Sequence, residues 1–333
     1  MTATEQELIH AAGAGDEDAF ARLVSTHRAD LHAHCYRMLG STTDAEDALQ
    51  EALVNAWRGI SRFEGRSSLR TWLYRIATNT CLKAVQRRPM RLLPIDYGPA
   101  GTDPHSDLGT PLAETVWIEP YPTVEATYEA REDIELAFVA ALQHLPATQR
   151  AVLILRDVLG FSGDETADVL GLTATAVYSS LQRAHKTVAS KRPSVSQQAT
   201  LRSVGDRQVA SIAARYVDAW ERGDVDAIVA MLTEDAALTM PPYAMWFRGA
   251  AAIGEFFASS PLSAVMRGRW RLLPTRANGQ LAFASYLWDE KYETCVAHGL
   301  NIVTLRGSLI AEVTAFLTDA SFFQLGLPTQ LDR

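Results

Sequence analysis

Residues 63–89 read FEGRSSLRTWLYRIATNTCLKAVQRRP and combine basic charge with aromatic rings. The single acid of this stretch is Glu64. Its basic side chains are Arg66, Arg70, Arg75, Lys83, Arg87 and Arg88. Phe63, Trp72 and Tyr74 are interleaved with them. Arginine and lysine neutralise phosphates, and aromatic rings stack on bases that have left the duplex, at about 1–3 kcal/mol per base. The stretch therefore predicts a surface that binds unpaired DNA.

The rest of the chain does not share this basic character. The 333 residues carry a formal net charge of −8, and this length favours two or three domains. No apolar run reaches the roughly 18–20 residues of a membrane helix, and the N-terminus lacks the layout of a signal peptide, so we expect a cytoplasmic protein. The cysteines form no C-x-x-C pair, and the cluster of His32, His34 and Cys35 has no second ligand pair at metal spacing. We expect no metal site and no cofactor.

Periodicity and composition divide the chain into domains. In residues 1–89 apolar side chains recur at helical spacing. Residues 90–128 are acidic and rich in proline, which is typical of a linker. A second helical block covers residues 129–192. Residues 206–333 begin with a helix and continue in segments rich in β-branched and aromatic residues, which predicts an α+β domain. The expected fold is two all-α domains followed by one α+β domain.

Residues 164–186 fit a helix-turn-helix. Ser162 and Glu165 form an S-x-x-E capping box for the first helix, and Gly171 supplies the turn. The polar face of the second helix carries Thr175, Tyr178, Ser179, Gln182, Arg183 and Lys186. These donors and acceptors suit base edges and phosphates in a major groove. The alternative is an ordinary helical hairpin with a solvated polar face.

An acidic ridge precedes the basic stretch. Asp44, Asp47 and Glu51 align at i, i+3 and i+7 on the expected helix over residues 41–58. Like charges at this spacing repel by about a few tenths of a kcal/mol per pair, and a basic partner would relieve the repulsion. A plain solvated face is the alternative.

These motifs resemble a known family. The string DAEDALQEALVNAW at residues 44–57 is similar to region 2.2 of bacterial RNA polymerase sigma factors of the extracytoplasmic-function type. Residues 63–79 resemble regions 2.3 and 2.4, and residues 145–186 resemble region 4. The resemblance implies an alternative sigma factor that binds the β′ and β subunits of core RNA polymerase and directs promoter-specific transcription initiation. It also implies that the chain is not an enzyme.

The resemblance carries over to particular residues. The implied polymerase-binding residues are Asp44, Asp47, Gln50 and Glu51. The implied contacts to the −10 element are Arg66, Arg70, Trp72, Arg75, Asn79, Arg87 and Arg88. The implied contacts to the −35 element are Thr175, Tyr178, Ser179, Gln182, Arg183 and Lys186. Tyr178 and His185 depart from the family's pattern, which leaves the −35 sequence open.

The linker and tail resemble a sigma subgroup with a C-terminal SnoaL-like domain. The string VWIEPYP at residues 116–122 is similar to its linker signature, and residues 215–232 are similar to the start of that cone-shaped α+β fold. Such a cone encloses a pocket, for which the candidates here are Tyr243, Trp246, Trp288, Glu293 and His298. We expect the domain, residues 206–333, to modulate activity by docking on the sigma body. A small ligand in the cone and an anti-sigma factor are both left open.

In the same family the linker follows the RNA exit path of the polymerase. The acidic residues that would face basic channel walls there are Asp103, Asp107, Glu114 and Glu119. A passive tether is the alternative. Two other classes also remain: a SnoaL-like small-molecule enzyme fused to a DNA-binding segment, and a conventional helix-turn-helix repressor. The enzyme predicts turnover by the tail alone, and the repressor predicts tight duplex binding without polymerase.

Overall fold

The chain forms two compact units in its computed structural model, which describes residues 3–87, 90–113, 116–122, 133–191, 193–264 and 266–332. One unit comprises Met1–Arg91 and Ala137–Arg192, and the other comprises Leu92–Leu136 and Pro193–Arg333. This division differs from the expected one. The two helical blocks form one unit, and nearly all of the expected linker belongs with the C-terminal domain.

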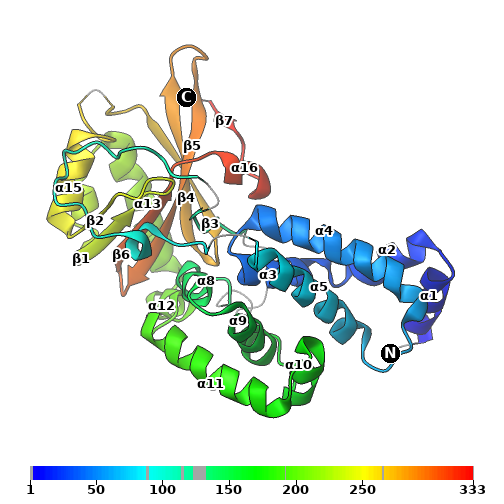
Figure 1. The fold of residues 1–333 in the computed structure, drawn as a ribbon. Coiled ribbons are helices and arrows are strands. Elements are labelled where there is room, and N and C mark those ends of the chain that lie inside the picture. Colours follow the sequence, from blue (N-terminus) through cyan, green and yellow to red (C-terminus); the bar gives the residue numbers. More distant parts are fainter. Residues whose placement is uncertain are drawn as a thin grey trace. The chain divides into compact units, whose positions relative to one another are not determined.

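Helices build the first unit (Figure 1). The helices of its first segment are α1 (Ala3–Gly13), α2 (Glu17–Ser25), α3 (Arg28–Leu39), α4 (Thr42–Gly59), the short 3-10 turn η1 (Ile60–Arg62) and α5 (Leu69–Val85). Those of its second segment are α8 (Leu136–Gln143), α9 (Ala147–Leu153), the π-helical turn η3 (Ile154–Val158), α10 (Gly163–Leu170) and α11 (Ala174–Lys191). In α4, Ser41 caps the helix by accepting the Asp44 N–H at 3.0 Å, and Ala45, Ala48 and Leu49 are buried.

A buried arginine joins the two segments of the helical unit. Arg150 on α9 donates hydrogen bonds to the carbonyl of Met38, at the end of α3, and to the side chain of Gln143. Gln143 in turn donates to the carbonyl of Arg37 at 3.3 Å. Carbonyl groups at a helix C-terminus carry partial negative charge, which offsets the charge of the buried guanidinium. Desolvation nevertheless lowers the pKa of Arg150 to about 10.

The helix-turn-helix prediction is confirmed in α10 and α11. Ser162 accepts the Glu165 N–H at 3.1 Å, and the Glu165 carboxylate accepts the Ser162 N–H at 2.8 Å, so the capping box is complete. Gly171 ends α10 in the left-handed conformation, with φ of 65°. Thr173 then accepts the Ala176 N–H at 3.2 Å at the start of α11.

The α+β prediction for the tail is also confirmed. The helices of the second unit are α6 (Pro94–Tyr97), α12 (Gln197–Val204), α13 (Asp206–Arg222), α14 (Val225–Val229), α15 (Ala250–Ser259) and α16 (Ala320–Gln324). Its strands are β1 (Leu232–Thr239), β2 (Trp246–Arg248), β3 (Trp270–Ala277), β4 (Gln280–Asp289), β5 (Thr294–Arg306), β6 (Leu309–Phe316) and β7 (Gln330–Leu331). Helix α12 lies within residues 193–205, which were expected only to separate the domains.

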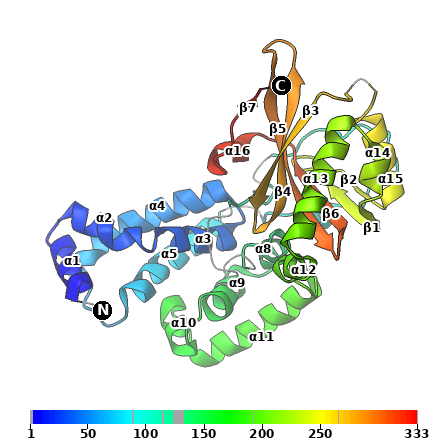
Figure 2. The same cartoon turned by 180° about the vertical axis from the view of Figure 1, so that it is seen from behind.

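The strands form one sheet in the order β2-β1-β6-β5-β4-β3, with β7 added to β5. Only the β1–β6 pair is parallel among these described strands. Helices α13, α14 and α15 gather on one side of the sheet (Figures 1 and 2). Tyr216 of α13 stacks on Phe283 of β4 with ring centroids 4.5 Å apart. On the other side, Tyr286 of β4 contacts Phe322 of α16.

The expected linker is bound to the tail domain along its described length. Gly101 donates its N–H to the Trp246 carbonyl at 2.7 Å, and Leu112 donates to the Pro242 carbonyl at 2.9 Å. Trp117 donates its indole N–H to the same Pro242 carbonyl at 2.9 Å. A Cβ at position 101 would meet the Met245 sulfur at 2.6 Å, so glycine at this position allows the chain to approach without displacing Met245. Residues 101–112, which we call the strap, are therefore attached to the tail domain at both ends.

Candidate functional site

The acidic ridge is only partly a surface feature. Asp44 is buried, and Arg91 donates to its carboxylate at 2.7 Å from an equally buried guanidinium. Its expected partners on α4 are exposed, namely Asp47, Gln50 and Glu51. Val54 follows them on the same helical face and is 48% exposed. Sequence reasoning missed Val54, although an apolar residue outside the buried stripe of α4 was a signal for it.

Two of the expected −10 residues contact the helix-turn-helix segment inside the helical unit. Arg70 on α5 donates to the Leu159 carbonyl at 2.8 Å, and its guanidinium lies 4.5 Å from the centre of the Phe161 ring. Arg75 lies 3.4 Å from the Asp168 carboxylate on α10. Both arginines remain exposed on their outer sides, so these contacts are at the edge of the interface.

The other expected −10 residues lie on or beside α5. Trp72 is half-buried against Phe63, with ring centroids 5.2 Å apart, whereas Asn79 is exposed. Arg87 is exposed, and Arg66 is exposed and pairs with its neighbour Glu64. Arg88 lies outside the described residues. Trp72, Arg75 and Asn79 share one face of α5, as their spacing predicts.

The expected −35 residues follow one side of α11. Thr175, Tyr178, Gln182, Arg183 and Lys186 are exposed, and Tyr178 is 57% exposed. Ser179 is half-buried and donates its hydroxyl to the Ala176 carbonyl at 3.1 Å. His185, the other departure from the family pattern, lies 2.5 Å from the Asp157 carboxylate.

The side chains of the H-x-H-C cluster, His32, His34 and Cys35, do not come together around a common point. His34 is buried, and its Nε2 lies 2.9 Å from the Thr78 hydroxyl, while His32 lies 3.7 Å from Glu46. Burial, with a smaller contribution from the Arg37 charge, lowers the pKa of His34 to about 3. Among the described residues no group of three or more His, Cys, Asp and Glu side chains is arranged to hold a metal ion. Nor is any described helix both long enough and apolar enough to cross a bilayer.

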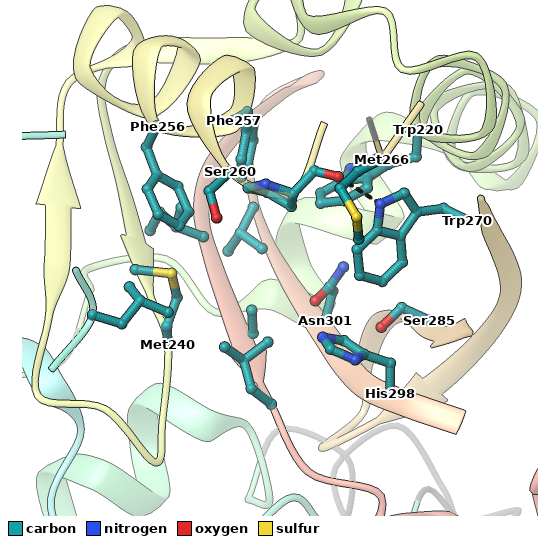
Figure 3. Close-up of a pocket in the computed structure, with 16 residues that line it drawn as sticks. Trp220, Met240, Phe256, Phe257, Ser260, Met266, Trp270, Ser285, His298 and Asn301 are labelled. Atoms are coloured by element: carbon teal, nitrogen blue, oxygen red, sulfur yellow. Dashed lines mark hydrogen bonds between the residues drawn. The ribbon is translucent and has the colours of Figure 1, made fainter. Parts of the chain in front are cut away.

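The tail domain contains a partly open cavity of about 310 Å³ between its sheet and its helices (Figure 3). Aromatic and thioether side chains line one part of it: Trp220, Met240, Phe256, Phe257, Met266 and Trp270. Its polar groups come mainly from β4 and β5, and Figure 3 shows Ser285, His298 and Asn301 close to one another below Trp270. The strap contributes Leu108 to the lining.

A β-bulge directs His298 into this cavity. The β4–β5 register pairs Ser285 with Gly299 and Tyr286 with Ala297, so His298 is the extra residue on β5. Its ring meets the Trp270 ring edge-to-face, with centroids 5.0 Å apart. Burial lowers the pKa of His298, so the ring is neutral near pH 7.

His298 alone among the five expected pocket residues lines this cavity. Trp246 is buried elsewhere and donates its indole N–H to the Gly98 carbonyl at 2.8 Å. Trp288 pairs with Cys295 farther along the β4–β5 hairpin, and Glu293 is exposed in its turn. Tyr243 lies in the loop between β1 and β2. The residues that sequence reasoning missed as cavity lining lie on the apolar faces of α13, α15 and β3. Their apolar spacing was a signal for burial, but the sequence does not show that these faces meet around one cavity.

Three parts of the chain match known families. Residues 23–89 match the Sigma-70 region 2 family, residues 135–188 match Sigma-70 region 4, and residues 213–313 match the SnoaL-like domain. These ranges contain the acidic and basic surfaces, the helix-turn-helix and most of the cavity.

Similar proteins carry the same assignment. The ECF RNA polymerase sigma factor SigG of Mycobacterium tuberculosis is 40% identical over 319 residues, which cover 94% of this chain and 85% of that protein. SigM of the same species, also an ECF RNA polymerase sigma factor, is 31% identical over 186 residues, 56% of this chain and 83% of that protein. The crystal structure of M. tuberculosis SigJ, an extracytoplasmic function sigma factor, has the same fold, with a TM-score of 0.59 at 20% identity, covering 92% of this chain and 99% of that one. Because the first relative spans nearly the whole chain, helical unit and tail together, this protein belongs to the ECF RNA polymerase sigma factors, which bind core RNA polymerase and direct it to promoters.

Proposed function

We propose that the chain docks on core polymerase through the exposed face of α4 formed by Asp47, Gln50, Glu51 and Val54, which we call the α4 face. The buried Asp44–Arg91 pair supports this proposal, because Asp44 is buried in it, whereas Asp47, Gln50 and Glu51 remain at the surface. An acidic rim around an exposed apolar residue suits a basic groove on a partner, since apolar contact adds affinity while charge orients the encounter.

The α4 face can be tested by charge reversal in the full-length protein. We expect Asp47→Lys with Glu51→Lys to abolish run-off transcription from a cognate promoter and to weaken binding to core polymerase by at least about tenfold. The matched control reverses two exposed acids of the tail domain, Asp226→Lys with Glu255→Lys, and changes the net charge equally. An equal loss of polymerase binding in both variants would mean that the change in net charge causes the loss, which would contradict the proposal.

We infer further that α5 and α11 divide promoter recognition between them. Trp72, Arg75 and Asn79 suit the unpaired −10 strand, because they share one helical face and combine a ring, a cation and an amide. On α11, Gln182 and Tyr178 suit base edges, whereas Arg183 and Lys186 suit phosphates. The contacts of Arg70 and Arg75 with Leu159, Phe161 and Asp168 would have to open for these arginines to reach DNA.

The tail domain, in this proposal, regulates and does not catalyse. Among the residues that the structure describes, the polar side chains lining its cavity are His298, Asn301, Ser260 and Ser285, with no carboxylate and no lysine. His298 has no carboxylate beside it among the described lining residues, and the neighbouring Ser285 hydroxyl donates its proton to the Gly299 carbonyl and not to the histidine. The histidine therefore lacks the engaged second group of an acid–base or nucleophile–base pair. The domain also holds the strap, so its state can alter the segment that connects the two halves of the helical unit.

The competing function is a small-molecule enzyme fused to a DNA-binding segment. That function predicts turnover by the tail alone and no response of transcription to changes at the strap. Regulation through the strap predicts that run-off transcription responds to Trp117→Phe, which removes the indole N–H bonded to the Pro242 carbonyl and so loosens the chain just after the strap at the carbonyl that also accepts from Leu112. Phe retains most of the ring volume, so the domain should stay folded. Unchanged transcription at several promoters, with a strap shown by hydrogen exchange to be released, would count against regulation through the strap. An anti-sigma factor remains outside this proposal.

A further inference from the structure

The cavity of the tail domain is larger than an ordinary packing defect. At about 310 Å³ it reaches the lower end of the range for small-molecule pockets, about 300–1,000 Å³. Protein interiors are close-packed, and atoms that line a void lose contacts on one side. A cavity walled by Trp220, Phe256, Phe257 and Trp270 therefore leaves many favourable contacts unmade until a ligand fills it.

One end of the cavity offers hydrogen bonds. Asn301 and His298 both project from β5 toward this end, and Ser285 is already engaged as a donor to the Gly299 carbonyl at 2.9 Å (Figure 3). Nearby, burial raises the pKa of the Tyr216 hydroxyl, and the neighbouring Trp220 and Asn301 side chains act in the opposite direction. Yet neither that hydroxyl nor the Trp220 indole N–H, both buried, reaches hydrogen-bond geometry with any described residue. Buried polar groups of this kind usually have a partner.

The lining excludes charge. Every described side chain that lines the cavity is apolar, aromatic, a hydroxyl, an amide or an imidazole. A carboxylate or an ammonium group would lose its hydration there without gaining a counter-charge, at a cost that a few hydrogen bonds do not offset. A neutral hydroxyl or carbonyl, by contrast, matches the donors and acceptors of the polar end.

The strap closes another part of the site. Leu108 lines the cavity and belongs to a segment held at Gly101 by the Trp246 carbonyl and at Leu112 by the Pro242 carbonyl. Met240, which also lines the cavity, lies two residues before Pro242. A ligand that lies between Leu108 and Met240 therefore keeps its contact with Leu108 only while the strap is in place.

We propose that this cavity binds an uncharged, mostly apolar ring compound whose single hydroxyl or carbonyl group meets His298 and Asn301, and that the bound compound holds the strap on the tail domain. The proposal concerns binding alone and does not depend on the docking and promoter contacts proposed above. It requires no chemical step.

Three matched probes test the ligand class by calorimetry on the full-length protein: 2-naphthol, naphthalene and 2-naphthoate. We expect 2-naphthol to bind most tightly, naphthalene about three- to tenfold more weakly for want of the hydrogen bond, and 2-naphthoate not at all. Binding of 2-naphthoate as tight as that of 2-naphthol, or no binding of 2-naphthol up to its solubility limit, would overturn the proposal.

Variants locate the site. Asn301→Leu should weaken the binding of 2-naphthol, which keeps only His298 as a polar partner, and leave the affinity for naphthalene unchanged. Ala315→Phe should fill the cavity and remove binding of both. Tyr292→Ala, at an exposed hairpin position, is the control and should change neither affinity. Thermal unfolding identifies any variant that has lost its fold, and Asn301→Leu decides the question if Ala315→Phe does not fold. Full 2-naphthol affinity in a folded Asn301→Leu protein would refute the polar end.

Hydrogen exchange tests the link to the strap. Saturating 2-naphthol should slow exchange of the Gly101 and Leu112 amides, both of which donate to carbonyls of the tail domain. Leu108→Ala should weaken this protection and lower the affinity. Exchange that is unchanged at both amides in the saturated protein would contradict the coupling.

Discussion

The carboxylate of Asp44 accepts a hydrogen bond from Arg91 at 2.7 Å, and both side chains are buried. This pair ties the start of α4 to the end of the first segment of the helical unit, 47 residues away. Removal of one partner from a buried ion pair leaves an uncompensated charge and costs about 3–5 kcal/mol. We therefore expect Asp44→Ala to lower the free energy of unfolding by that amount in urea titrations.

The neighbouring acids should behave differently. Asp47→Ala and Glu51→Ala change exposed positions and should alter the free energy of unfolding by less than about 0.5 kcal/mol, while weakening core polymerase binding. If Asp44→Ala were as stable as these variants and lost only polymerase binding, the pair would have to be assigned to docking and not to the fold.

A second prediction concerns the contact between α5 and α10. Asp168→Arg replaces an attraction to Arg75 by repulsion, and exposed pairs are worth about 0–1 kcal/mol. We expect the full-length protein to bind a fluorescent single-stranded −10 oligonucleotide about two- to fivefold more tightly, measured by anisotropy. Asp164→Arg, on the same helix, adds the same charge at another exposed position and is the control. An equal gain in both variants would mean that net charge alone is responsible.

A third prediction separates base contacts from phosphate contacts on α11. Gln182→Ala should lose about 1–3 kcal/mol at one promoter position and relax the preference there. Arg183→Ala should weaken binding to all sequences alike and reduce the slope of log affinity against log salt by about one. Selection from randomised −35 duplexes, repeated at two salt concentrations, measures both effects. A sequence preference that is unaffected by Gln182→Ala would remove that residue from base recognition.

A fourth prediction follows from the buried His34. Its pKa is about 3 in the folded protein, whereas that of an exposed histidine is 6.5, so between these values the unfolded chain binds a proton that the native chain does not. Stability must then fall as the pH falls below about 6.5, by about 1.4 kcal/mol per pH unit once the unfolded imidazole is charged. Urea titrations at pH 7.5 and 5.5 should show a smaller difference for His34→Gln than for the unchanged protein. An identical difference in both would show that His34 does not contribute.

Short-range features of the fold follow from the sequence. The capping box of Ser162 and Glu165 and the left-handed Gly171 are decided within a few residues of chain, because a helix end must satisfy its own free N–H and carbonyl groups. The helix-turn-helix and the shared face of Trp72, Arg75 and Asn79 could therefore be predicted without a structure. The same holds for the change from helical to strand periodicity in the tail.

Long-range features depend on which distant segments meet. The sequence alone marks Asp44 as one of three aligned acids, and only the tertiary structure places Arg91 beside it and buries both. In the same way, residues 90–128 have the composition of a linker, but the carbonyls of Trp246 and Pro242 hold the strap as part of the tail domain. The residues that line the cavity come from α13, α15, the strap, the strands β1, β3, β4, β5 and β6 and the adjoining loops, so no local sequence pattern predicts the cavity. Local hydrogen bonding and periodicity depend on residues that are neighbours in the sequence. The burial of a side chain and its pairing with a distant residue depend on contacts that form only when the chain folds.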